Sequence, residues 1–90
     1  MNTLAKIHCL LSNGMFQNEY AVEIKISGGG VASFFMDKDL VLVNGSSHTG
    51  FINANVVKEN KENLTVLLPK EALEQGTRWV QVPRDQIEFA

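Results

Sequence analysis

Apolar and polar side chains alternate along most of this chain, and this two-residue period restricts the fold more than any other feature. Successive side chains of a pleated strand point to opposite faces, so alternation predicts strands with one face in a core. The clearest segments are residues 4–11, LAKIHCLL, and 19–27, EYAVEIKIS. Their apolar faces consist of Ala5, Ile7, Cys9 and Leu11 in the first, and Tyr20, Val22, Ile24 and Ile26 in the second. Both segments are typical of half-buried antiparallel strands.

Further short apolar runs, separated by turn residues, predict the remaining strands. These runs span residues 31–36, 40–43, 51–57, 63–68, 77–82 and 87–89. Only residues 69–76, PKEALEQG, have a helical pattern, with Pro69 suited to the first turn and Gly76 to the C-terminal stop. The sequence shows no internal repeat, and residues 1–90 are predicted to form one domain.

Many short strands with glycine-marked turns indicate a mainly β fold. We predict a single small barrel or a strongly bent antiparallel sheet, with one short helix near residues 69–76. The C-terminal segment RWVQVPRDQIEF resembles the end of Src-homology-3-like barrels: a strand, a proline, a tight turn and a short last strand. This resemblance implies the fold alone, because LAKIHCLL lacks the aromatic residues with which signalling members of that family bind proline-rich peptides.

The chain is also loosely similar to short bacterial proteins of unknown function. The similarity rests on GMF, EYAVEI, SFF, DK and RWVQVP, and it transfers no activity.

Charge and cysteine content argue against several classes of function. Ten acidic and eight basic residues are spread along the chain, whereas duplex-nucleic-acid binding needs a basic face. The single cysteine, Cys9, excludes an internal disulfide and the zinc sites built on cysteine pairs. We recognise neither a signal peptide nor a membrane-spanning helix. A cytoplasmic protein without a cofactor, a metal or a membrane partner is therefore expected.

Three local patterns raise the question of catalysis or ligand binding. Gly28–Gly30 precede another strand rather than a helix, so a tight turn is favoured over a phosphate cradle. Residues 37–39, DKD, lack the further oxygen ligands of a calcium loop and fit a solvated break between strands. Cys9, His48 and Asp37 could be written as a nucleophilic set, but Cys9 falls on the predicted core face.

The single tryptophan gives the strongest indication of function. Alternation in residues 77–82 turns Trp79 away from the core face that carries Val80 and Val82. Phe51, Val57 and Leu67 also fall off that face, with Leu10 as a further candidate, and together they could form an apolar patch. Two coverings of Trp79 remain open: the predicted helix, through Ala72 and Leu73, or another protein chain.

The leading hypothesis is a non-catalytic protein-interaction module or accessory subunit, which binds an unidentified protein or a second copy of itself. The proposed contact residues are Trp79, Phe51 and Leu67 as apolar anchors with Val57 beside them, and Arg78, Gln81 and Arg84 as a polar rim. The first alternative is a small barrel that binds single-stranded nucleic acid. The second is a small enzyme that uses Cys9 or His48.

Overall fold

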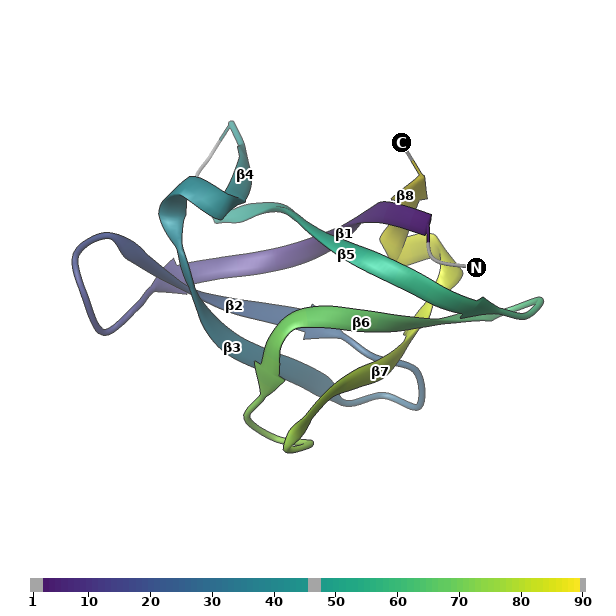
Figure 1. Cartoon of the computed structure of the whole chain (residues 1–90). Coiled ribbons are helices and arrows are strands. Elements are labelled where there is room, and N and C mark those ends of the chain that lie inside the picture. Colours follow the sequence, from purple (N-terminus) through teal and green to yellow (C-terminus); the bar gives the residue numbers. More distant parts are fainter. Residues whose placement is uncertain (1–2, 46–47, 90) are drawn as a thin grey trace.

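The computed structural model describes residues 3–45 and 48–89 of the chain, which form one nearly closed antiparallel barrel (Figure 1). Part of the predicted loop at 44–50, residues 46 and 47, lies outside the described residues. The elements are β1 (Thr3–Asn13), β2 (Glu19–Lys25), β3 (Val31–Asp37), η1 (Lys38–Leu40), β4 (Val41–Asn44), β5 (Thr49–Glu59), β6 (Asn63–Ala72), β7 (Thr77–Pro83), η2 (Arg84–Gln86) and β8 (Ile87–Phe89). The η elements are single 3₁₀ turns. The prediction of a mainly β small barrel is confirmed.

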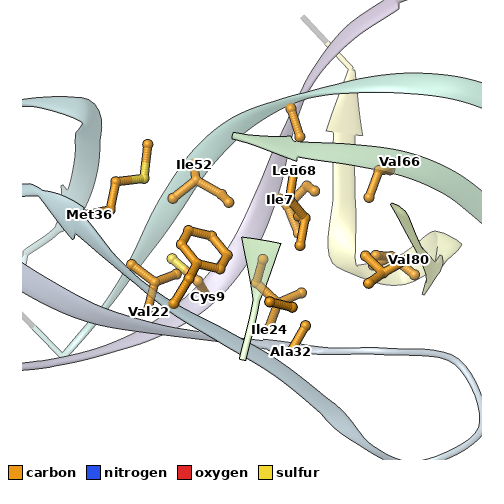
Figure 2. Packing of buried hydrophobic residues seen from close by; sticks show 14 of the residues in the cluster. Ile7, Cys9, Val22, Ile24, Ala32, Met36, Ile52, Val66, Leu68 and Val80 are labelled. Atoms are coloured by element: carbon orange, nitrogen blue, oxygen red, sulfur yellow. The ribbon is translucent and has the colours of Figure 1, made fainter. Parts of the chain in front are cut away.

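Alternation determines which side chains form the core. Ile7, Ile24, Ile52, Leu64 and Leu68 are completely buried, and the residues between them along each strand face outward. Figure 2 shows the side chains of several strands, among them Ile7, Ile24, Ile52 and Leu68, meeting in this interior. The predicted core faces of residues 4–11, 19–27, 51–57 and 63–68 are therefore confirmed, with Tyr20 and Ile26 packed against the core as partly buried residues.

The predicted helix at residues 69–76 is wrong. Residues 69–72 continue β6, which becomes irregular between Leu67 and Ala72, and residues 73–76 form a turn. The one helix-like feature is a hydrogen bond from the Gly76 amide to the Ala72 carbonyl, at 2.8 Å. Burial of Leu68 and Ala72 in the barrel outweighs the local helical preference, which is weak in so short a segment.

The strand pairing repeats itself about the ladder between β1 and β5. The strand order is β3-β2-β1-β5-β6-β7, so each half contributes three consecutive strands to the same path. Each half then passes through a 3₁₀ turn into a short strand that pairs with the other half, β4 with β5 and β8 with β1. Residues 3–44 and 49–89 are thus related by a pseudo-two-fold axis, although the sequence shows no repeat.

The two halves differ in how they close the barrel. β6 has ten residues, whereas its counterpart β2 has seven, and the longer strand carries the β6–β7 turn over β3. There the Leu73 amide donates to the Ser33 carbonyl at 2.8 Å, and the Glu74 carboxylate accepts bonds from the Ser33 amide and hydroxyl. On the other side of the seam, the Ser27 amide donates to the Gln81 carbonyl at 2.8 Å. The edge of β3 is therefore covered by its own chain.

Candidate functional site

Trp79 lies on the outer face of β7, as the alternation predicts. Val80 and Val82 point into the core, whereas 52% of the Trp79 surface is exposed. The Trp79 amide donates a hydrogen bond to Oγ1 of Thr77 on the same strand, at 3.2 Å. Of the two coverings that the sequence left open, the capping helix is excluded, because residues 69–76 form no helix and turn toward β3. Within the described residues, the indole is thus half covered at most.

The strand register places Trp79 at the end of a row of outward-facing side chains. Trp79 lies opposite Leu67 on β6, and Leu67 lies opposite Asn55 on β5. Asn55 in turn lies opposite Leu4 on β1, whose side chain is also exposed. Side chains directly opposite one another on one face of a sheet are close enough to touch. We call Leu4, Asn55, Leu67 and Trp79 the Trp79 row.

Two of the other predicted contact residues lie beside this row. Val57 follows Asn55 on the same face of β5, at a β-bulge between Val56 and Lys58, and is partly buried. Gln81 is exposed two residues after Trp79, one step along the outer face of β7. These residues extend the Trp79 row with one apolar and one polar side chain.

Phe51 belongs to a different part of the surface. It lies opposite His8 on β1 and Leu42 on β4. The rings of His8 and Phe51 form a tilted contact, with centroids 4.4 Å apart and an angle of 56° between their planes. Phe51 precedes Asn55 by four residues on β5, a separation of roughly 13 Å along a strand. The structure therefore separates Phe51 from the Trp79 row.

The two predicted rim arginines are both engaged within the chain. The Arg78 Nε atom donates to the Leu68 carbonyl at 2.7 Å, where β6 loses its regular pairing. Arg84 donates to the carbonyls of Asn60 and Lys61 and lies 3.6 Å from the Glu59 carboxylate, so it fastens η2 to the β5–β6 turn. Arg78 is adjacent to Trp79 in the sequence, but strand alternation places it on the opposite face of β7. Arg84 supports the hairpin.

The pseudo-two-fold axis relates the Trp79 row to a second row of different chemistry. In the other half, Ser33 lies opposite Glu23, Glu23 opposite Leu10, and Leu10 opposite Thr49. Leu67 and Trp79 thus correspond to Glu23 and Ser33. Ser33 of the polar pair is partly covered by the β6–β7 turn through Glu74. In the apolar pair, Trp79 is exposed and Leu67 is partly buried.

The alternation argument overlooked exposed apolar residues in turns. Met15 and Phe16, between β1 and β2, are 72% and 67% exposed, and Leu40 in η1 is also exposed. Turn residues have no period-two pattern, so strand alternation cannot assign them a face. The paired letters MF in an otherwise polar turn were the available signal.

Cys9 is placed in the core, as predicted, with 5% of its surface exposed. Burial raises the pKa of the Cys9 thiol to about 11, so the group is neutral at physiological pH. His48 and Asp37 are both exposed, and the His48 carbonyl accepts a hydrogen bond from the Leu11 amide. The thiol that would serve as nucleophile therefore faces away from the surface that carries the other two groups.

The remaining local patterns have structural explanations. Gly28 and Gly29 have φ values of 90° and 94°, which only glycine adopts readily, in the predicted tight turn between β2 and β3. The DKD segment breaks the strand, with Lys38 and Asp39 in η1. Lys38 lies 5.0 Å from the centre of the Tyr20 ring, a cation–π contact.

Comparisons of the chain with protein-family models, with curated proteins and with solved structures found no match. Among residues 3–45 and 48–89, no group of three or more His, Cys, Asp and Glu side chains is placed to hold a metal ion. In the same residues, no helix has the length and apolar character needed to cross a membrane.

Proposed function

We propose that this chain is a non-catalytic protein-interaction module, or an accessory subunit, that binds another protein chain through the Trp79 row. The observation that carries the proposal is the half-exposed indole of Trp79 beside Leu67, on a face that the β6–β7 turn leaves open. Leu4 and Val57 add apolar surface, while Asn55 and Gln81 supply polar groups at its margin. Such a composition, a tryptophan anchor with polar groups around it, is typical of the centre of protein interfaces.

The energetics favour a covered indole in the working state. A tryptophan side chain presents roughly 150–250 Å² of surface, so about 100 Å² of it remains in water in this chain. Transferring that area to a partner contributes about 2–3 kcal/mol to binding before the costs of association. Leu4 and Leu67 enlarge the gain, and together the row is suited to act as a small group of dominant contacts.

The fold itself does not require apolar residues at these positions. Glu23 and Ser33 occupy the symmetry-related positions of Leu67 and Trp79 in the same barrel, within the same kind of ladder. Because these positions hold a polar pair in the other half, strand pairing alone does not require the apolar pair. This internal comparison supports an intermolecular role for the Trp79 row.

Site-specific photo-crosslinking tests the proposal with a matched control. A benzophenone amino acid replaces Trp79 in one variant and Glu23, the counterpart of Leu67, in the other. In cells of the source organism and in concentrated purified protein, the variant at 79 should give one discrete protein adduct that the variant at 23 does not give. Where the adduct contains a different protein, excess wild-type protein should abolish it, whereas excess Leu67→Glu protein should not. Where the adduct contains a second copy of this chain, it should form with added wild-type protein but not with added Leu67→Glu protein.

Two outcomes of this experiment would contradict the proposal. The first is the same adduct pattern from positions 79 and 23, which would indicate random collisions. The second is an adduct at 79 that the Leu67→Glu protein removes as well as the wild type does. The mass of the specific adduct distinguishes a second copy of this chain from a different protein.

The single-stranded nucleic-acid alternative is supported by a different surface. The tilted pair of His8 and Phe51 rings lies outward on β1 and β5, where a base could stack on one of them. The acidic side chain of Glu88 lies 3.3 Å from Nε2 of His8, which opposes a phosphate backbone at that point. Fluorescence anisotropy with labelled oligonucleotides at low and high salt tests this alternative. If the protein binds an oligonucleotide through this surface, Phe51→Ala should abolish the binding.

We further propose that the barrel is Src-homology-3-like and that the protein is bacterial and cytoplasmic. The fold assignment is supported by the observed order of β7, Pro83, η2 and β8 at the C-terminal end. The compartment is supported by the unpaired thiol of Cys9, which suits a reducing environment. The bacterial source rests only on the loose sequence similarity described above.

A further inference from the structure

We infer that this barrel is a fused dimer, in which residues 3–44 and 49–89 are two copies of one unit and each unit takes the other as its binding partner. The unit consists of three meandering strands, a 3₁₀ turn and a short strand that is donated to the other copy. The surface concerned is the ladder between β1 and β5 together with the donated strands β4 and β8. This inference is independent of the role proposed for the Trp79 row.

The register of the central ladder fixes the position of the two-fold axis. Ile7 of β1 lies directly opposite Ile52 of β5, and both side chains are completely buried. On the far side of Ile52 lies Val41 of β4, and on the far side of Ile7 lies Ile87 of β8. An exchange of the two halves therefore maps Ile7 onto Ile52 and Ile87 onto Val41, so this set of four paired positions is unchanged.

The turns that precede the donated strands begin and end at residues with nearly the same backbone geometry. η1 follows Asp37, with φ −59° and ψ 138°, and η2 follows Pro83, with φ −59° and ψ 144°. The turns end at Val41, with φ −113° and ψ 131°, and at Ile87, with φ −120° and ψ 136°. Aspartate and proline share no side-chain chemistry, so the common geometry reflects an equivalent place in the fold rather than similar residues.

Each half leaves groups that only the other half satisfies. Without residues 49–89, the β1 edge from Thr3 to Leu10 would lose its ladder with β5, and β4 would have no strand to pair with. In that isolated half, Ile7 would be exposed and the backbone groups beside it would be unpaired, which costs free energy. Such an open apolar edge favours pairing with another strand. The same holds for β5 and β8 in the second half. The contact between the halves thus has the character of an obligate dimer interface.

Cutting the connection between the units in the folded protein tests the inference. A specific protease site is inserted between Ser46 and Ser47 of the full chain, and the purified protein is cleaved under native conditions. The two fragments should remain together with an unchanged circular dichroism spectrum and the mass of a single chain. After separation in denaturant, they should reassemble at equal concentrations when the denaturant is removed.

The thermal melt of the nicked protein gives the quantitative result. Unfolding then releases two molecules, so tenfold dilution lowers the stability by about 1.4 kcal/mol and the melting temperature by roughly 5–10 °C, whereas the melt of the intact chain does not depend on concentration. A control protease site between Asn60 and Lys61 cuts inside the second unit, and its fragments should fail to reassemble after denaturation.

Three results would overturn the inference. One is loss of the native spectrum on cleavage at 46–47. Another is a fragment that stays folded as a monomer without the other. The third is equally complete reassembly after cleavage at 60–61, because the boundary between the units would then have no special status.

Discussion

Replacing Trp79 with threonine removes the proposed anchor while keeping a residue that forms strands well. Trp79 is 52% exposed, so about half of its surface, roughly 75–125 Å², is buried against its own chain. At about 25 cal/mol per Å², that burial is worth about 2–3 kcal/mol, and a compact unfolded state lowers this to roughly 1.5–2.5 kcal/mol. Since the side chain borders water, its removal leaves no cavity.

Leu68→Ala provides the comparison from the completely buried core. Leu68 lies next to Leu67 on β6 and has no exposed surface. Its truncation creates a cavity, and such changes cost about 3–5 kcal/mol. Leu68, although smaller than Trp79, should therefore contribute more to the free energy of unfolding.

Urea unfolding followed by far-ultraviolet circular dichroism measures both variants against the wild type at one low protein concentration. We expect Trp79→Thr to destabilise the chain by about 2 kcal/mol. Added in excess to the crosslinking variant at position 79, it should leave the adduct with a different protein in place, as Leu67→Glu does. A loss of 3–5 kcal/mol, equal to that of Leu68→Ala, would show that the indole is a core residue of the isolated chain. The argument for an open, intermolecular surface would then be refuted.

Further predictions concern pH, the thiol and the barrel seam. The hydrogen bond from the Ser33 hydroxyl holds the pKa of Glu74 below its ordinary value of 4.5. The Glu74 carboxylate therefore contributes to stability above pH 4.5, and this contribution is lost as the pH falls through the pKa of the folded state. Glu74→Gln should remove this part of the acid dependence in urea melts. Burial raises the pKa of Cys9 from 9.0 to about 11, so iodoacetamide at pH 8 should label the native thiol at least about 100-fold more slowly than the unfolded one, and rapid native labelling would contradict the placement of Cys9. A Cβ atom at Gly50 would clash with the Leu42 carbonyl oxygen, so Gly50→Ala should push β4 away from β5 and cost about 1–3 kcal/mol. Unchanged stability would show that this contact is looser.

The part of the fold that follows from local alternation was predictable from the sequence. Strand faces depend on residues two apart, so Ile24 and Leu68 could be assigned to the core and Trp79 to the outside without knowing which strands are neighbours. The sequence also predicted the turn after Pro83 and the short last strand. Residues 69–76 were the exception, because their helical composition competes with tertiary burial of Leu68 and Ala72.

The arrangement of the strands could not be predicted in this way. The register decides that Leu67 lies opposite Trp79 while Phe51 lies opposite His8, and nothing local in the sequence specifies long-range pairing. The pseudo-two-fold repeat was hidden for a related reason. Equivalent core positions share only their apolar character, and equivalent outer positions such as Glu23 and Leu67 have different chemistry.

Acrylamide quenching of the single tryptophan tests the central claim most directly, because the whole signal comes from Trp79. In dilute protein, the quenching constant should lie between those of a buried indole and of the urea-unfolded chain. The quenching constant should then fall toward the buried value when the partner identified by crosslinking, or a high concentration of the protein itself, is present. A low quenching constant in dilute protein that does not change with concentration or with the partner would show that the chain covers Trp79 itself, and would contradict the proposed interaction surface.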